Sequence, residues 1–299
     1  MKRRTTLAYI ALLGTMLLWS SAFPGIKFVL RRLQDPYAIA MLRLGFASAG
    51  LLVAAAIMRL PLPHREDLGM IALTGVLGFS LYHCLLNLGM SYEMVSAGQG
   101  SFIISTVPIW TTLLARPYLG EKITPYAWGG MALGLSGVGL MSLDPSSLSF
   151  SAGSLIVLSG AVSSASCFVL QKRLLDRYRP LHVSIYVTIA GSLPILAYLP
   201  WAWEPVAAMD TAGWAAVAYL GLFPIGIGYF LNAFALSRLP ANRSTQFLLM
   251  VPLFATVLAW LTLGDWPRPI IAVGGPMILG GILLGQRGAS SEDEDSSEA

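Results

Sequence analysis

Residues 95–141 read VSAGQGSFIISTVPIWTTLLARPYLGEKITPYAWGGMALGLSGVGLM, and residues 239–285 read LPANRSTQFLLMVPLFATVLAWLTLGDWPRPIIAVGGPMILGGILLG. At an offset of 144 residues and without a gap, the two segments hold 13 identities in the 46 columns that begin at 95 and 239. The identities include Pro108 with Pro252, Pro125 with Pro269, Gly130 with Gly274 and Gly137 with Gly281. Because proline and glycine determine backbone geometry, this repeat preserves a shape, and it predicts that half of the chain is a copy of the other half.

The chain has too few charged residues to coat a soluble globule. Of its 299 residues, 11% are charged and 56% are hydrophobic, and the mean hydropathy is +0.68. Soluble domains carry about 25% charged residues. A window of about 19 residues predicts ten apolar helices, each long enough to cross roughly 30 Å of hydrocarbon. The expected spans are 6–29, 36–58, 68–91, 95–117, 124–142, 152–171, 181–201, 211–236, 241–263 and 267–286.

Basic residues gather in alternate connections between these spans. Of the 19 Lys and Arg residues, 14 lie before the first span or after an even-numbered one, which predicts that both termini are cytoplasmic. Five spans per half is an odd number, so the second half must enter the membrane from the opposite side. We therefore expect an all-α integral membrane protein in which two inverted five-helix repeats surround a central cavity. The expected units are repeat one at 1–147, repeat two at 148–287 and an acidic, disordered cytoplasmic tail at 288–299.

Inverted repeats are typical of secondary transporters, and the rival classes find little support. An enzyme would need a nucleophile with a base or a cluster of metal ligands, and the three histidines, two cysteines and the carboxylates show no such spacing. A channel would need rings of charged or carbonyl groups, which no segment supplies. The net charge of +4 comes from loops that flank the spans and does not indicate nucleic-acid binding. We expect a transporter without a catalytic residue, metal or cofactor.

Several motifs resemble the EamA repeats of the drug/metabolite transporter superfamily. They are Trp19–Phe23 in the first span, Leu42-Arg43 in the second, the segment 119–140 and its copy at 263–284. The likeness covers nearly the whole chain and is greatest to the YddG-type aromatic amino acid exporters of bacterial inner membranes. The second copy departs from the pattern, because Asp265 replaces the glutamate and its first span lacks an equivalent of Trp19. The resemblance implies a multi-pass protein of the bacterial inner (plasma) membrane.

The intramembrane polar groups gather on spans 1, 3, 4, 6, 8 and 9, which we expect to line the cavity. Span 3 carries the most chemistry, because His83 and Asn87 lie four residues apart on one helical face with Tyr82 beside them. An ionisable residue inside the membrane favours function, and a hydrogen-bonded structural histidine is the alternative. The candidate substrate-binding residues are Trp19, Tyr82, His83, Asn87, Gln99, Phe102, Trp110, Ser163, Tyr229, Asn232 and Gln246.

Prolines inside the spans are candidate gating hinges, because each removes a helical hydrogen bond. They are Pro24, Pro108, Pro224 and Pro252. We expect Arg43 to pair with backbone or lipid headgroups rather than with substrate, and Lys27 to extend towards the outer surface. The glycine-rich spans 5 and 10 are expected to be scaffold in which helices approach closely.

The aromatic and neutral lining suits a small amphipathic solute. We therefore expect an exporter of aromatic and other neutral amino acids that works by alternating access. No Asp or Glu lies at mid-membrane and His83 is the sole candidate for proton coupling, which favours facilitated or gradient-driven flux. The alternative is a proton-coupled exporter of other metabolites or drugs, such as nucleosides or toxic analogues. The expected partners are the small-molecule substrate and membrane lipid, not nucleic acid, with the chain acting as a monomer or homodimer.

Overall fold

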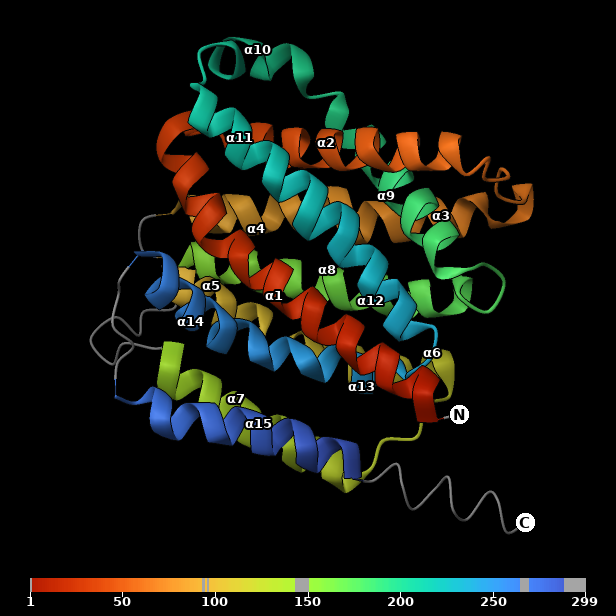
Figure 1. The fold of residues 1–299 in the computed structure, drawn as a ribbon, viewed down its shortest axis with the longest axis vertical. Coiled ribbons are helices and arrows are strands. Elements are labelled where there is room, and N and C mark those ends of the chain that lie inside the picture. Colours follow the sequence, from red (N-terminus) through yellow and green to blue (C-terminus); the bar gives the residue numbers. More distant parts are fainter. Residues whose placement is uncertain (1, 93–94, 96, 143–150, 264–268, 288–299) are drawn as a thin grey trace.

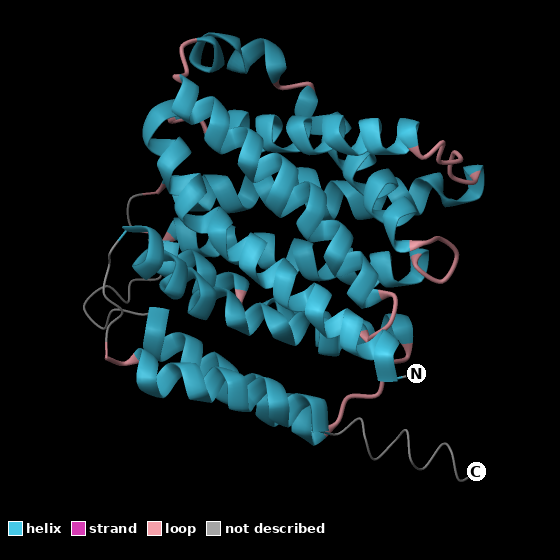
Figure 2. Cartoon of the chain, viewed as in Figure 1, coloured by secondary structure: helices cyan, strands magenta, loops and turns pink. Residues whose placement is uncertain are grey.

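The computed structural model describes residues 2–92, 95, 97–142, 151–263 and 269–287, and within these ranges every regular element is a helix (Figures 1 and 2). The first half contains α1 (Lys2–Leu33), α2 (Pro36–Ile57), η1 (Arg65–Asp67), α3 (Leu68–Gly75), η2 (Val76–Leu81), α4 (Tyr82–Ser91), α5 (Ala97–Ile104), α6 (Val107–Leu119) and α7 (Pro125–Ser142). The second contains α8 (Ala152–Leu174), α9 (Pro180–Leu196), α10 (Leu199–Ala207), α11 (Thr211–Leu220), η4 (Gly221–Ile227), α12 (Gly228–Leu236), α13 (Ala241–Gln246), η5 (Phe247–Met250), α14 (Val251–Leu263) and α15 (Ile271–Arg287). The expected tail at 288–299 and Asp265 lie outside the described residues.

Long apolar helices confirm the expectation of a helical membrane protein. Within the described part of the chain, five helical runs are long and apolar enough to cross a bilayer: Thr5–Leu33, Pro36–Ile57, Arg65–Ser91, Ala152–Leu174 and Thr211–Leu236. Two more apolar helices, Pro180–Leu196 and Ile271–Gln286, are shorter. Most of the helices run alongside one another in a single bundle (Figure 1).

Three of the expected spans differ from the structure because each is broken. The expected span 95–117 is divided between α5 and α6, and the span 241–263 is divided among α13, the 3₁₀ turn η5 and α14. Pro108 and Pro252 are the second residues of α6 and α14, where a missing backbone N–H costs least. The span 181–201 ends early, at Leu196, and its last residues belong to α10, which lies at the top of Figure 1.

The helix breaks recur in the two halves. α6 and α14 begin at Val107 and Val251 and end at Leu119 and Leu263, so both bounds differ by 144 residues. α2 and α9 begin at prolines that are also 144 residues apart. The third long helical run of each half consists of α3, η2 and α4 in the first half and of α11, η4 and α12 in the second. Each run contains a π-helical segment, η2 or η4, at a corresponding place. The repeat that was identified from proline and glycine therefore determines where helices start and stop.

Glycines bring α7 and α15 into backbone contact at the lower edge of the molecule (Figure 1). A Cβ added to Gly137 would lie 2.6 Å from the carbonyl oxygen of Gly274, and one added to Gly274 would lie 2.8 Å from that of Gly137. Gly130 and Gly281 meet in the same way. Small residues let two helices approach this closely inside a membrane. The expectation that these glycine-rich helices form a close-packed scaffold is confirmed.

A lysine in each half binds backbone carbonyls at the end of that half's third helical run. The Lys27 Nζ on α1 donates to the carbonyl of Met90 at 2.6 Å. The Lys172 Nζ on α8 donates to the carbonyls of Leu236 at 2.6 Å and Leu239 at 2.8 Å. Carbonyls at a helix C-terminus lack intrahelical donors, so a cation stabilises them. Lys27 is therefore held by α4 instead of only extending towards the surface.

Two further contacts join the halves. The carboxylate of Glu121 accepts hydrogen bonds from the backbone N of Ala241 at 2.6 Å and of Asn242 at 3.1 Å, at the start of α13. On the other side of the bundle, the Ser48 Oγ on α2 donates to the Ser192 Oγ on α9 at 2.7 Å. Positions 48 and 192 are themselves 144 residues apart, so equivalent residues of the two halves meet.

Candidate functional site

A small, partly open cavity lies where helices of both halves meet. Its volume is about 40 Å³, which holds one or two water molecules. Small-molecule sites usually enclose roughly 300–1,000 Å³. Its walls come from α1, α2, α4 and α5 of the first half and from α8, η4, α12, η5 and α14 of the second. This cavity is therefore much smaller than a usual small-molecule site.

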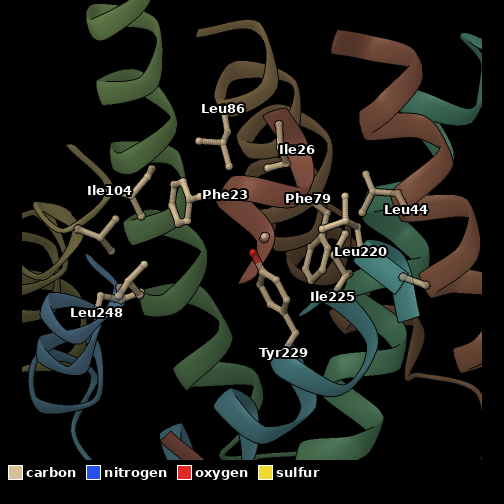
Figure 3. Close-up of a cluster of buried hydrophobic side chains, with 14 of the residues drawn as sticks. Phe23, Ile26, Leu44, Phe79, Leu86, Ile104, Leu220, Ile225, Tyr229 and Leu248 are labelled. Atoms are coloured by element: carbon tan, nitrogen blue, oxygen red, sulfur yellow. The ribbon is translucent and has the colours of Figure 1, made fainter. Parts of the chain in front are cut away.

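Aromatic rings form a continuous group beside the cavity. The ring centroid of Tyr229 on α12 lies 5.0 Å from that of Trp19, 4.5 Å from Phe79 and 6.2 Å from His83. Figure 3 shows Tyr229 among buried hydrophobic side chains, including Phe79 and residues of both halves such as Phe23 and Ile225. Aromatic contacts at these distances stabilise the fold beyond the effect of burying apolar area. The wall thus joins the two halves through side chains rather than through backbone.

Trp19 and Ser163 support the two π-helical segments. The Trp19 Nε1 donates to the carbonyl of Pro224 in η4 at 3.0 Å, and the Ser163 Oγ donates to the carbonyl of Leu77 in η2 at 2.7 Å. Positions 19 and 163 are 144 residues apart, so equivalent positions perform the same role on the opposite half. Carbonyls that irregular helix leaves free need a partner inside a bilayer. Trp19 also lines the cavity, whereas Ser163 does not and its neighbour Ser164 does.

Arg43 on α2 lines the cavity, although we expected it to pair with backbone or headgroups. Its side chain is buried, with 2% of the residue exposed. The Nη1 donates to the Asn87 Oδ1 at 3.3 Å, and the Nε has no hydrogen-bond partner. Among the described residues the ion pairs are Arg32 with Asp210 and Arg177 with Asp67, and neither involves Arg43. The expected pairing of Arg43 with backbone or headgroups is not what the structure shows, since its partner is the side chain of Asn87. The rule that selected His83, an ionisable group inside the membrane, applies equally to Arg43 and could have identified it as a cavity residue.

His83 on α4 has two features that match two different roles. Its Nδ1 lies 2.9 Å from the carbonyl oxygen of Phe79, which makes Nδ1 the protonated nitrogen in that hydrogen bond. This contact fits the alternative of a structural histidine. The ring also lines the cavity beside Tyr82, whose centroid is 4.8 Å away. His83 is therefore held in place by the backbone while its ring faces the cavity.

The structure brings together only part of the predicted set. Trp19, Tyr82, His83, Tyr229 and the hinge candidate Pro224 line the cavity. The other seven binding candidates lie outside its described lining: Asn87, Gln99, Phe102, Trp110, Ser163, Asn232 and Gln246.

Several of these seven residues have other contacts. Asn87 binds Arg43 and also donates its Nδ2 to the carbonyl of Pro36 at 3.2 Å. The Trp110 Nε1 donates to the Thr106 Oγ1 at 3.3 Å. The Oε1 of Gln246 accepts from the Gln286 Nε2 at 3.3 Å. Helical periodicity places such residues on a face of a helix, but the rotation of that helix in the bundle decides what the face meets.

The hinge candidates occupy three kinds of position. Pro224 lies inside the π-helical η4, and Pro108 and Pro252 follow the breaks that precede α6 and α14. Pro24 lies within the uninterrupted α1, on its exposed side. Three of the four prolines therefore coincide with irregular backbone.

Within the described residues, His, Cys, Asp and Glu side chains form no cluster of three or more that could hold a metal, and Cys84 and Cys167 are free thiols.

Comparisons with known proteins identify relatives along almost the whole chain. The model of the EamA-like transporter family matches residues 6–143 and 151–285. A probable terminal-alkyne amino-acid exporter of Streptantibioticus cattleyicolor is 36% identical over 277 residues, which cover 92% of this chain and 91% of that protein. The uncharacterized transporter YdfC of Bacillus subtilis is 33% identical over 268 residues, covering 89% of this chain and 87% of its own. One solved crystal structure has the same fold, with a TM-score of 0.76 at 18% identity over 95% of this chain and 98% of that one.

Proposed function

The chain belongs to the EamA-like transporter family, and from this premise we propose that it exports amino acids, aromatic and other neutral ones, by alternating access. The family and the apolar helical runs make it a multi-pass transporter of a membrane. The relative in Streptantibioticus cattleyicolor is named a probable terminal-alkyne amino-acid exporter, which supports amino acids as the substrate class here. We place this chain in a bacterial inner membrane with both ends cytoplasmic. α1 begins and α15 ends at the same end of the bundle, which supports placing both ends on one side of the membrane (Figure 1).

The observation that carries the proposal is the combination of aromatic rings and one buried cation at the cavity. Trp19, Tyr82 and Tyr229 offer apolar area with polar edges, and Arg43 offers a positive charge. A solute with an apolar or aromatic side chain and an acidic end is complementary to both features. A lining of this kind fits a neutral amino acid better than it fits an uncharged drug.

The small cavity and the duplicated helix breaks support alternating access. A cavity of about 40 Å³ is smaller than an amino acid, and in this proposal the halves separate on one side at a time to admit it. The proposal assigns ten membrane crossings to two inverted five-helix repeats. The opposite directions of α7 and α15, which lie side by side in Figure 1, support that inversion. Breaks at η2, η4 and before α6 and α14 supply the positions at which the helices bend.

Counterflow into proteoliposomes tests the proposal. The purified chain is reconstituted into vesicles preloaded with unlabelled L-phenylalanine, and uptake of labelled L-phenylalanine, L-leucine and uridine is followed. We expect uptake of the two amino acids above that of protein-free vesicles and none of uridine. Uptake of uridine alone would replace the proposal with the alternative of nucleoside export.

Proton coupling is tested in the same vesicles. We propose facilitated flux, because the described cavity lining holds no Asp or Glu and His83 is its one imidazole. Uptake should therefore respond to the amino acid gradient and remain when the pH gradient is collapsed with an ionophore. A pH-gradient requirement that disappears in the His83→Gln variant would establish proton coupling instead.

A further inference from the structure

We propose that Arg43, positioned by Asn87, binds the carboxylate of the transported molecule, so that an acidic group is required for transport. This inference rests on the proposed function and deepens it, because it names the chemical group that the cavity recognises. Arg43 is a binding residue in this proposal, and Asn87 is a positioning residue that acts through it.

The contacts of the guanidinium carry the first step. Asn87 is fully buried, and its Oδ1 accepts a hydrogen bond from the Arg43 Nη1 at 3.3 Å. Its Nδ2 donates to the carbonyl of Pro36 at 3.2 Å. The side-chain amide is therefore fixed at both ends. It holds the guanidinium at the cavity while the Nε keeps its hydrogen without a partner. A buried N–H without an acceptor costs free energy that a ligand can recover.

The charge carries the second step. A buried cation is normally paired with an anion, because removing it from water is costly. The ion pairs of the described residues, Arg32 with Asp210 and Arg177 with Asp67, leave the guanidinium without a carboxylate. A carboxylate that enters the cavity would supply that missing counter-ion. Arginine suits this task because its planar fork of N–H donors matches the two oxygens of a carboxylate.

The position of the aromatic wall carries the third step. Arg43 is on α2 of the first half, whereas Tyr229 and Pro224 approach from the second. A molecule whose carboxylate lies against Arg43 therefore directs its remaining part towards rings from both halves. The carboxylate would be fixed by hydrogen bonds and the side chain by apolar contact, which permits several side chains on one common acidic group.

The test compares L-phenylalanine with L-phenylalaninamide, which has the same side chain and amine but no carboxylate. Both are offered in counterflow to the wild-type chain and to Arg43→Gln, Arg43→Lys and Asn87→Leu. The wild type should take up the acid at least about 10-fold faster than the amide. Arg43→Gln should lower acid uptake by about 10- to 100-fold and bring the acid-to-amide ratio close to one. Arg43→Lys should keep an intermediate ratio, because the charge remains while the fork is lost.

The matched control is Arg32→Gln. Arg32 is a partly exposed arginine of α1 that pairs with Asp210 at 3.4 Å, away from the cavity, so its replacement should leave the ratio unchanged. Monodispersity and thermal melting in detergent identify variants that fail to fold, and for these the wild-type and Arg43→Lys ratios decide. A wild type that carries acid and amide equally, or an Arg43→Gln variant that keeps its preference for the acid, overturns the inference alone. Absence of uptake of any amino acid by the folded wild type overturns the proposed function and this inference with it.

Discussion

Position 43 in the first half of the chain is an arginine that faces the cavity, and position 187, 144 residues later on α9, is a buried valine. The same offset pairs Trp19 with Ser163, which both donate a hydrogen bond to a π-helical carbonyl of the other half. The bounds of α6 and α14 recur at this offset, and a lysine in each half binds carbonyls at a helix end. The halves therefore share a backbone design and differ in the side chains that reach the cavity.

This difference shows that one set of residues determines the shared backbone and another set determines the chemistry of the cavity. Prolines, glycines and carbonyl-binding side chains preserve a backbone shape that the two halves share. The charge at the cavity is not duplicated, because the equivalent of Arg43 is Val187, which is buried and lies outside the described cavity lining. The first half accordingly provides Arg43, Tyr82 and His83, whereas the second contributes mainly aromatic and apolar side chains.

The largest expected effect concerns the shared backbone. Gly137→Leu should separate α7 from α15, because its side chain would have to occupy the place of the Gly274 carbonyl. Overpacking costs about 1–3 kcal/mol or more, and we expect the melting temperature in detergent to fall by about 5–10 °C. Gly281→Leu, at the equivalent position, should cause a fall of similar size. Gly129→Leu is the control, since that glycine is exposed and its nearest neighbour would be 3.6 Å away. Unequal effects at 137 and 281 would contradict the shared design.

The second prediction concerns Asn87 in α4 and Asn232 in α12, which lies one residue beyond the position equivalent to 87. Asn87 binds Arg43, whereas the Nδ2 of the buried Asn232 has no hydrogen-bond partner. Asn87→Leu should lower the rate of amino acid uptake by about 10-fold, because Arg43 loses its positioning contact. Asn232→Leu should leave uptake within about two-fold of wild type and keep or raise the melting temperature, since an unsatisfied polar group is removed. Equal losses of uptake in both variants would show that the chemistry is as symmetric as the backbone.

The third prediction sharpens the comparison of the two lysines. Lys172 donates to two carbonyls and Lys27 donates to one, so the same device is stronger in the second half. We expect Lys172→Met to lower the melting temperature about twice as far as Lys27→Met, with shifts of a few degrees. Methionine keeps the apolar stem and removes the ammonium. Thermal melting at matched protein and detergent concentrations gives the two shifts, and a larger shift at Lys27 would contradict this ranking.

The smallest expected effect concerns Trp19 and its equivalent Ser163, of which only Trp19 lines the cavity. Trp19→Phe and Ser163→Ala each remove one hydrogen bond to a π-helical carbonyl, and hydrogen bonds between membrane helices contribute about 0.6 kcal/mol on average. Both should lower the melting temperature by about 1–3 °C. Only Trp19→Phe should also change the KM for L-phenylalanine, because Trp19 lines the cavity. Ser159→Ala is the control, since that hydroxyl binds only the Leu155 carbonyl of its own helix. A change in KM for Ser163→Ala would place that residue in the site after all.

The sequence was a good guide to the scaffold because proline and glycine act locally. The repeat, the helical class and the irregular backbone at Pro224 could be anticipated from those residues, and Pro108 and Pro252 were expected to bend continuous spans. The breaks before α6 and α14 were not anticipated, because a hydropathy window averages over a run and does not detect an interruption of a few apolar residues. α10 was not predicted as a separate helix for the same reason, since Leu199–Ala207 continues the apolar run of α9.

The cavity was harder to anticipate because it depends on how each helix is rotated against its neighbours. Trp19, Tyr82, His83 and Tyr229 lie beside it as expected, whereas Gln246 is on a face that meets α15. No periodicity within one helix fixes that rotation. The partner of Arg43 differs from the expected headgroups for a different reason, because its distance from the outer end of its span suggested contact with them. Arg43 is buried instead and binds Asn87, which is 44 residues away in the chain.

The crossing of α7 and α15 has a consequence for the history of the chain. Gly130 meets Gly281 and Gly137 meets Gly274, so position 130 of one half faces the counterpart of 137 in the other, and 137 faces the counterpart of 130. Such reciprocal pairing is the mark of an isologous surface, which is complementary to a second copy of itself. A single ancestral half with these two glycines could already have formed a homodimer through this surface. Fusion of two gene copies would then have made that dimer contact permanent and left each half free to acquire its own side chains.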